Sequence, residues 1–240
     1  YKHNSTKESV KKLQSFGNIL IPPAVGELAS GLSGEGRLPE PEEVVEFIHN
    51  HYSANLPLNG KKVLISAGPT VEQLDPVRFI SNHSSGKMGY SLAETALSLG
   101  GDVTLVSGPT NQIISSKKIH LINVKTGNEM YSNVLDNYED ADIVIMAAAV
   151  SDYKPKEFSQ KKIKKDNKEI NIKFEKTTDI LNELGKHKKN QFLVGFALEN
   201  DNEIINAKTK LKNKNLDLIV LNSLNDKGAG FGYDTNKVSL

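Results

Sequence analysis

Lys62-Val-Leu-Ile-Ser-Ala67 is a short apolar run that stops at Gly68-Pro69, and it predicts a buried β-strand. Similar runs recur outward from it, at 102–107, 119–124, 142–148, 192–197 and 217–221. Stretches that read as helices lie between them, at 86–100, 127–138 and 202–214. Strands that are apolar on both faces and alternate with helices predict a parallel sheet that is covered on both sides.

We therefore expect residues 57–240 to form an α/β domain, with a Rossmann-like, mostly parallel sheet and helices on both faces. The lysine-rich region 154–175 interrupts the alternation and predicts an inserted arm, in which residues 170–174 alternate as an exposed strand would. The sequence stops at Leu240 in what looks like another strand, so the domain could be incomplete there.

Residues 1–56 are a poor candidate for an independent fold. We predict a helix at 6–16, a strand at 18–22 that ends at Pro22-Pro23, a glycine-rich stretch at 26–36 and a helix at 39–51. These pieces offer little apolar surface to bury, and residues 55–60 are typical of a linker.

The composition of the 240 residues is that of a soluble globular protein, with 38% hydrophobic and 25% charged residues. A net charge of +1 gives no global field that favours nucleic acid or a membrane surface. Cysteine is absent, which excludes disulfides, thiolate nucleophiles and cysteine-ligated metals and fits a cytoplasmic location. No apolar run approaches the roughly 20 residues that span a bilayer, and the N-terminus does not read as a signal peptide.

The connection from Gly68 to Ser85 is long and follows the first strand of the sheet, at the edge where open α/β sheets bind ligands. It ends in Ser84-Ser85-Gly86 at a helix start, where free N–H groups and hydroxyls suit a phosphate. Arg78 is one of two arginines and suits a bidentate phosphate or carboxylate contact. Arg78 could equally be a surface residue, and the Ser84–Gly86 turn could be a plain helix cap.

Several further residues allow both a structural and a functional interpretation. Asp152 follows the apolar strand 142–148 and could simply begin a loop, and Asp179 could simply cap a helix. Phe196 could stack on a nucleotide base or belong to the core. Lys210 and Lys214 share one helical face, which could grip phosphates or face solvent.

The fifteen residues Asp75-Pro-Val-Arg-Phe-Ile-Ser-Asn-His-Ser-Ser-Gly-Lys-Met-Gly89 resemble the signature of phosphopantothenate–cysteine ligase, the synthetase half of a bacterial bifunctional coenzyme A enzyme. The segment 147–153 resembles the same family's Ala-Ala-Val-x-Asp-Tyr motif, and the lysine cluster at 161–165 resembles its catalytic lysine motif. The resemblance covers residues 58–240 through several separate motifs in order.

The resemblance implies a site for each of these motifs. Asn82 stands where the family's asparagine stabilises an acyl-cytidylate, and Lys162 stands at the catalytic lysine on a flexible arm, with Lys161 as an adjacent alternative. Arg78 and Ser84, Ser85 and Gly86 are candidates for binding the substrate phosphate. The residues implied in CTP binding are Asp152, Lys162, Asp179, Ile180, Leu181, Asn182, Phe196, Lys210 and Lys214.

The implied reaction joins 4′-phosphopantothenate to L-cysteine at the expense of CTP, through an acyl-cytidylate. Mg²⁺ is expected with CTP and neutralises the triphosphate, and no residue is predicted to ligate a metal directly. The family also implies a homodimer formed through this domain, with no nucleic-acid or membrane partner.

Residues 1–56 resemble the C-terminal tail of the flavin-dependent phosphopantothenoylcysteine decarboxylase. The segment 26–31 resembles that enzyme's active-site flap, with Ser30 where the family generally has a cysteine. FMN would belong to the decarboxylase body, which this sequence lacks, so we do not expect decarboxylase activity from it.

Two other functions compete with the ligase interpretation. A nicotinamide-dependent reductase should carry its glycines in a short first turn and an acid after the second strand, but that strand ends Val106-Ser107-Gly108. A nucleic-acid-binding module could use the lysine arm, although the near-zero net charge and 6% aromatic content disfavour it.

Overall fold

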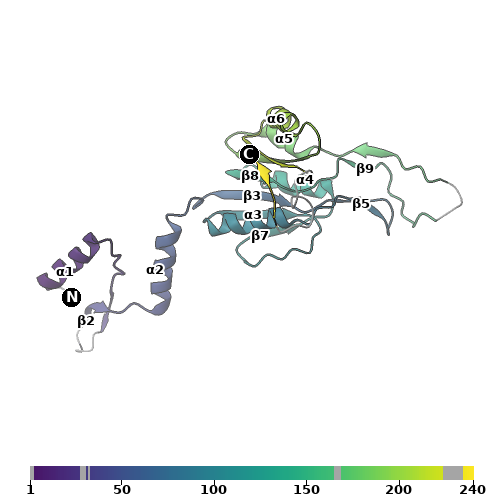
Figure 1. Cartoon of the computed structure of the whole chain (residues 1–240). Coiled ribbons are helices and arrows are strands. Elements are labelled where there is room, and N and C mark those ends of the chain that lie inside the picture. Colours follow the sequence, from purple (N-terminus) through teal and green to yellow (C-terminus); the bar gives the residue numbers. More distant parts are fainter. Residues whose placement is uncertain (1–2, 28–30, 32, 165–168, 224–234) are drawn as a thin grey trace. The chain divides into compact units, whose positions relative to one another are not determined.

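The computed structural model describes residues 3–27, 31, 33–164, 169–223 and 235–240 (Figure 1). The chain divides into two compact units, Tyr1–Leu56 and Pro57–Leu240. Ser30, the candidate flap residue, lies outside the described residues.

The first unit contains helix α1 (Asn4–Ser15), an antiparallel hairpin of β1 (Ala24–Glu27) and β2 (Ser33–Arg37), and helix α2 (Pro41–Ser53). The strand predicted at 18–22 is wrong, because these residues pair with no strand and the prolines that follow cannot donate to a ladder. The glycine-rich stretch instead forms the hairpin.

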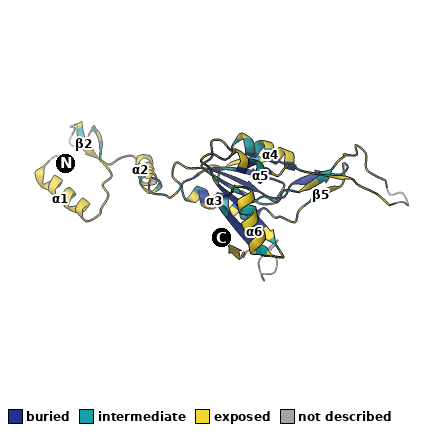
Figure 2. Cartoon of the chain, turned by 90° about the horizontal axis from the view of Figure 1, so that it is seen from above, coloured by how far each residue is buried: buried dark blue, intermediate teal, exposed yellow. Residues whose placement is uncertain are grey.

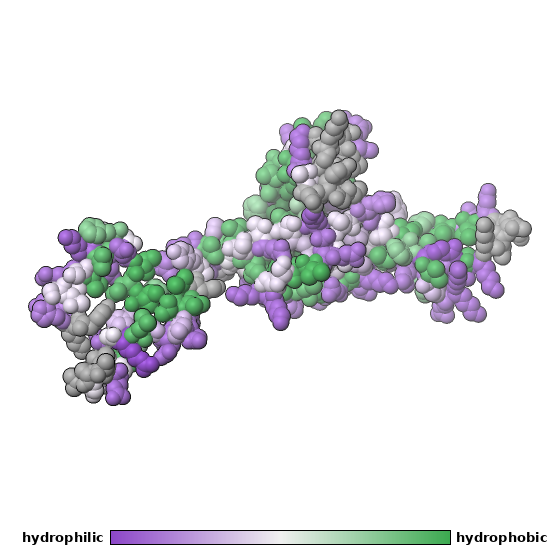
Figure 3. Space-filling view, turned by 60° about the horizontal axis from the view of Figure 1, so that its bottom comes forward, coloured by the Kyte–Doolittle hydropathy of each residue, from purple (hydrophilic) through white to green (hydrophobic). Residues whose placement is uncertain are grey.

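The first unit has no core in the part that the structure describes, where every residue is exposed or half-buried (Figure 2). Hydrophobic side chains gather on its surface (Figure 3), and those that are strongly exposed include Leu13, Phe16, Val25, Leu38 and Val45. Pro41 at the first turn and a capping box between Glu40 and Glu43 define the start of α2.

The second unit is built on a seven-stranded sheet with the order β13-β12-β11-β8-β3-β6-β7. All neighbouring strands of this sheet are parallel except β13, which runs antiparallel to β12. The strands are β3 (Lys62–Ala67), β6 (Asp102–Ser107), β7 (His120–Asn123), β8 (Ile143–Met146), β11 (Phe192–Glu199), β12 (Leu218–Ser223) and β13 (Val238–Ser239). The predicted mostly parallel, Rossmann-like α/β fold is therefore confirmed.

Helices cover both faces of this sheet, because alternate side chains of β3 belong to different hydrophobic clusters. Val63 and Ile65 pack with helix α3 (Lys87–Ser98) on one face. Leu64 belongs to the cluster on the other face, to which α4 (Gly127–Asp136), α5 (Ile180–His187) and α6 (Glu203–Asn213) contribute. Figure 1 shows α3 on one side of β3 and α5 and α6 on the other. None of the helices in the described ranges has the length and apolar character to cross a membrane.

The long connection after β3 is not irregular throughout. It contains an antiparallel hairpin of β4 (Val71–Gln73) and β5 (Phe79–Ser81). The arm begins and ends in a second small ladder, β9 (Tyr153–Pro155) with β10 (Phe174–Lys176), so the strand predicted at 170–174 starts later than expected. Lys154 and Glu175 face each other across this ladder, with 3.4 Å between Nζ and Oε1.

Close packing of α3 on β3 fixes the start of the helix. Gly89 lies so near β3 that a Cβ atom there would approach the Cβ of Ala67 to 2.5 Å. Gly86, the N-cap residue, has φ of 79°, a left-handed conformation that favours glycine. The helix N-terminus is therefore held directly beside the carboxyl end of β3.

Candidate functional site

A cavity of about 440 Å³ opens at the carboxyl edge of the sheet. Its size is within the range of small-molecule sites. One wall is the start of α3, and the other consists of the ends of β8, β11 and β12. The lining residues are Ser84, Ser85, Gly86, Lys87, Met88, Gly89, Ser91, Ala147, Ala148, Ala149, Phe196, Ala197, Leu198, Asn222, Thr235 and Asn236.

The Ser84–Gly86 turn lies in this cavity, as expected for a phosphate site. The amide of Gly86 donates to Ser84 Oγ at 3.3 Å, and Thr110 Oγ1 donates to the carbonyl of Ser85 at 2.6 Å. The second contact fastens the turn to the segment that follows β6. The N-terminus of a helix of this length attracts anions through its backbone N–H groups and its dipole.

Asn82 lies beside the cavity and is tied to the end of β8. Its Nδ2 donates to the carbonyl of Ala149, a lining residue, at 2.9 Å. The same carbonyl accepts from the amide of Thr70 at 3.2 Å. The hydrogen bond orients the Asn82 amide, although the catalytic role expected for it stays a prediction.

A cluster of charged side chains adjoins the cavity at Phe196. Lys210 Nζ donates to the carbonyl of Phe196 at 2.6 Å, and Lys214 Nζ pairs with Asp179 Oδ2 at 2.7 Å. Asp179 also caps α5 by accepting from the amide of Asn182 at 3.1 Å. Asp179 therefore caps a helix, as the structural interpretation predicted, and its expected contact with CTP stays a prediction.

Electrostatics sets Lys210 apart within this cluster. Burial, followed by the nearby charge of Lys214, lowers the pKa of Lys210 below its ordinary value of 10.5. Glu199, Asp179 and Asp152 act in the opposite direction. A bound polyanion would favour the charged form of Lys210, so the cluster is suited to phosphate groups.

Two of the residues predicted to contact CTP have side chains in the core. Ile180 and Leu181 are buried, at 4% and 8% exposure, and pack in the hydrophobic cluster under α5. Only their backbone atoms are available to a ligand. Phe196, by contrast, is half-buried and lines the cavity, as base stacking requires.

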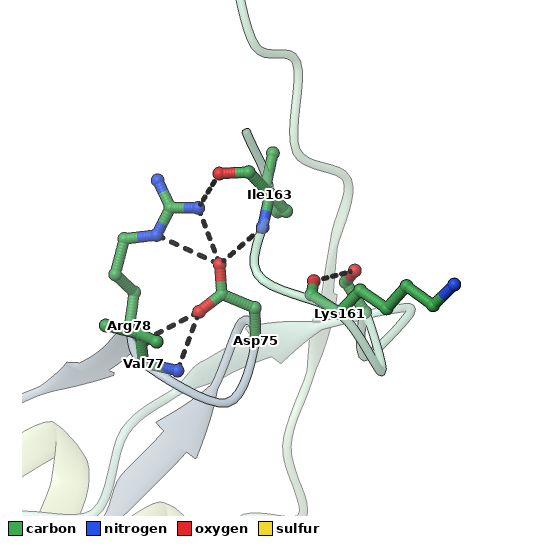
Figure 4. Close-up of polar contacts among 6 residues, drawn as sticks. Asp75, Val77, Arg78, Lys161 and Ile163 are labelled. Atoms are coloured by element: carbon green, nitrogen blue, oxygen red, sulfur yellow. Dashed lines mark hydrogen bonds and ion pairs between the residues drawn. The ribbon is translucent and has the colours of Figure 1, made fainter. Parts of the chain in front are cut away.

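Arg78 is engaged by the protein itself (Figure 4). Its Nε and Nη2 donate to Asp75 Oδ2 at 3.0 and 2.5 Å, and Nη2 also donates to the carbonyl of Ile163 at 2.8 Å. These contacts account for the surface position of Arg78 without a ligand, so its predicted contact with substrate phosphate stays a prediction.

Lys162 is exposed and lies on the arm, outside the set of residues that line the cavity. Its neighbour Ile163 is bonded to Asp75 and Arg78, and Figure 4 shows the Lys161 side chain directed away from these contacts. The structure thus brings together the turn, Asn82, Phe196 and the charged cluster, and it leaves the arm lysines apart from the cavity.

The sequence analysis missed Asn222, whose side-chain oxygen is buried without a hydrogen-bond partner in the cavity wall. Asn222 belongs to the carboxyl-terminal half of β12, and the edge rule that was applied to the connection after the first strand points to it too. Asp75 was also missed, although an aspartate three residues before one of only two arginines is a usable signal.

No group of three histidine, aspartate or glutamate side chains within the described ranges could hold a metal ion.

Residues 58–240 match the family described as the DNA/pantothenate metabolism flavoprotein C-terminal domain. The chain belongs to this family. The match covers the sheet, the cavity and the arm, and it confirms the resemblance to the synthetase part of the bifunctional coenzyme A protein.

Curated relatives of this flavoprotein family match the chain along its whole length. The coenzyme A biosynthesis bifunctional protein CoaBC of Bacillus subtilis (strain 168) is 45% identical over 242 residues, which are 100% of this chain and 60% of that protein. A cysteine/cysteine sulfinic acid decarboxylase from an unknown prokaryotic organism is 51% identical over 243 residues, which are 99% of this chain and 68% of that protein. The chain therefore spans about 60% of the bifunctional relative.

Solved structures of the flavoprotein family share the fold. The crystal structure of the C-terminal domain of CoaBC is 43% identical, with a TM-score of 0.61, and the match covers 69% of this chain and 79% of that one. The DNA/pantothenate metabolism flavoprotein from Streptococcus pneumoniae has a TM-score of 0.65 at 23% identity, over 75% of this chain and 92% of that one. The second likeness supports the fold alone.

Asp75 should make the stability of this domain depend on pH. The hydrogen bond from the Arg78 side chain, helped by backbone N–H groups, holds the pKa of Asp75 well below its ordinary 3.8. The stabilisation is thus complete above that value and is lost as the pH falls toward the folded-state pKa. We expect Asp75→Asn to lower the melting temperature near pH 7, and this difference from the wild type should shrink below pH 3.8.

Thermal unfolding of both proteins between about pH 2.5 and pH 7 measures this difference. The exposed Asp102 supplies the control, because Asp102→Asn should leave the melting temperature close to that of the wild type throughout. A pH-independent difference for Asp75→Asn would contradict an ionised, hydrogen-bonded Asp75.

Proposed function

We propose that this chain carries the CTP-dependent ligation of 4′-phosphopantothenate and L-cysteine, which forms 4′-phosphopantothenoylcysteine in coenzyme A biosynthesis. Membership of the flavoprotein family and the match to the C-terminal domain of CoaBC support the pathway. The choice of CTP rests on the family resemblance of the sequence motifs. The identity of the site residues rests on those motifs and on the geometry of the carboxyl edge.

One hydrogen bond carries the proposal, the one from Lys210 Nζ to the carbonyl of Phe196 at 2.6 Å. It joins the cavity to the charged cluster, since Phe196 lines the first and Lys210 belongs to the second. A nucleotide with its base near Phe196 therefore has two lysines within reach of its phosphates. The acyl substrate would place its own phosphate at the Ser84–Gly86 turn.

The proposed chemistry has two balanced steps. A carboxylate oxygen of 4′-phosphopantothenate attacks the α-phosphorus of CTP, the bond to the bridging oxygen breaks, and pyrophosphate leaves. The amine nitrogen of cysteine then attacks the acyl carbon of the cytidylate, CMP leaves with the oxygen, and the amine loses a proton to solvent. Neither step needs a protein nucleophile.

The protein contributes position and charge in both steps. Lys210 and Lys214 offset the negative charge of the triphosphate, and Lys162 on the arm is proposed to offset the charge that develops on pyrophosphate. Asn82 is proposed to hold the acyl-cytidylate. Mg²⁺ bound to the triphosphate would supply further charge neutralisation.

Exposed hydrophobic side chains near the arm support a homodimer of this domain. Phe79, Tyr153, Phe158, Ile170 and Phe174 are between 45% and 57% exposed. Figure 3 shows hydrophobic side chains gathered in the region where the arm leaves the sheet. Exposed apolar groups of this kind are typical of an interface.

The ligase proposal predicts release of pyrophosphate. The chain with CTP, 4′-phosphopantothenate and Mg²⁺ should release one equivalent without cysteine and continue to turn over when cysteine is added. Lys162→Gln should slow the release about a hundredfold, because an unneutralised phosphate charge is costly in a desolvated site. Asn82→Asp should slow formation of the final product by placing a negative charge beside the intermediate.

Lys161→Gln is the matched control, and a larger loss at Lys161 than at Lys162 would move the catalytic assignment by one residue. A coupled pyrophosphate assay measures all four proteins. Absence of release with either CTP or ATP in the wild type would reject the ligase.

Lys214→Met should raise the KM for CTP about tenfold, since one charge-assisted contact to phosphate is lost. Lys208→Met removes an exposed lysine from the same helix and should leave the KM unchanged. Initial rates at varied CTP concentration measure both. Equal effects of the two variants would show that α6 acts only through its overall charge.

The proposed homodimer predicts a molecular mass twice that of the chain in sedimentation equilibrium. Phe158→Asp should shift the population toward the monomer by placing a charge in the apolar interface, whereas Ile113→Asp, at another strongly exposed apolar position, should not. A monomeric wild type would contradict this part of the proposal.

A further inference from the structure

Asp75 is a fully buried carboxylate with an unusually complete set of hydrogen-bond donors. Its Oδ1 accepts from the amides of Val77 and Arg78, each at 2.8 Å. Its Oδ2 accepts from Arg78 Nε at 3.0 Å, Arg78 Nη2 at 2.5 Å and the amide of Ile163 at 3.1 Å. Both oxygens of the buried charge are therefore satisfied, which a stable buried ion requires.

One of these donors comes from far away in the sequence. Val77 and Arg78 belong to the turn of the β4–β5 hairpin, but Ile163 is 88 residues from Asp75 and lies on the arm (Figure 4). Arg78 Nη2 donates to the carbonyl of Ile163 at 2.8 Å. Both backbone polar groups of one arm residue are thus held by one ion pair, which we name the arm anchor (Asp75, Arg78 and Ile163).

Further hydrogen bonds hold the same part of the arm next to the arm anchor. The amide of Ser159 donates to the carbonyl of Leu74 at 3.0 Å, and Ser159 Oγ donates to the carbonyl of Lys161 at 2.6 Å. The segment from Ser159 to Ile163 is consequently fixed at both of its ends to the residues next to Asp75. Lys162 lies inside this fixed segment.

The geometry points to Asp75 as a positioning residue: through Ile163 it fixes the backbone of Lys162 and so defines the position from which this lysine acts in the proposed reaction. This inference rests on the proposed function for its catalytic part. The anchoring part stands on the hydrogen bonds alone. Arg78 then serves mainly to hold the arm, because its Nε and Nη2 are already occupied by Asp75 and Ile163.

Energetics explains why this anchor differs from an ordinary surface ion pair. An exposed pair is weak because water competes for both partners. Asp75 is out of contact with water, so loss of the Ile163 or Arg78 donors leaves a buried charge incompletely bonded, which is strongly unfavourable. Release of the arm segment removes the Ile163 donor from Asp75, and this loss disfavours separation of the arm from the hairpin turn.

Limited proteolysis with trypsin tests the anchor independently of catalysis. Asp75→Asn keeps the shape of the side chain but removes the charge, and its amide presents N–H groups where donors already point. We expect cleavage after Lys161, Lys162 or Lys164, identified by mass spectrometry, to become at least about tenfold faster, because local opening exposes the backbone. Pyrophosphate release should fall about a hundredfold, since misplacement of a catalytic group by about 1 Å has an effect of this size.

Ile163→Pro provides a second route that leaves the buried ion pair intact. It removes the N–H group that donates to Asp75 Oδ2, and its ring also fixes φ at residue 163. Cleavage is then scored after Lys161 and Lys164, because trypsin does not cut a Lys–Pro bond. Asp142→Asn is the matched control. Asp142 also accepts from a backbone amide, that of Lys62 at 2.9 Å, and from a side chain, Lys61 Nζ at 3.1 Å, but it lies just before the amino end of β8.

Faster arm cleavage in Asp75→Asn and Ile163→Pro, with melting temperatures well above the assay temperature and with Asp142→Asn unchanged, supports the anchor. Unchanged cleavage in both variants overturns it. Faster cleavage with wild-type pyrophosphate release overturns the positioning of Lys162. Should the wild type release no pyrophosphate, the ligase proposal fails while the cleavage pattern still decides the anchor.

Discussion

The parallel pairing of β3 with β8 is the constraint on which the rest of the second unit depends. It runs in register from Val63 opposite Ile143 to Ser66 opposite Met146 and continues as a bridge between Pro69 and Ala149. The strand order reverses direction at this pair, and open α/β sheets bind ligands beyond the carboxyl ends at such a point. The hairpin after β3 and the small residues after β8 are therefore neighbours in space.

The charged side chains at this edge make contacts that support the fold without a ligand. Asp179 caps α5 and pairs with Lys214, while Lys210 bonds the end of β11. Each contact stabilises the folded chain without a ligand, and burial together with the nearby charge of Lys214 lowers the pKa of Lys210.

The two units differ in what holds them together. The second unit has a core on each face of its sheet, whereas the described residues of the first unit contain no buried side chain. Burial of apolar surface is the main favourable term in folding. The short elements of the first unit thus rely on local features, such as the capping box of α2, more than on packing.

The sequence by itself determined the strands and helices of the sheet. β3 and β6 begin and end where their apolar runs predict. A strand that is buried on both faces is visible in the sequence as a short continuous run of apolar residues. The motifs also indicated which segments belong to one site. Only the tertiary structure decided the β4–β5 hairpin, the starting point of β10, the place of Asn222 in the cavity wall and the contact of Asp75 with Ile163. Those features depend on contacts between residues that fold together in three dimensions. Such contacts produce no periodic pattern in the sequence of either segment, so the sequence alone does not predict them.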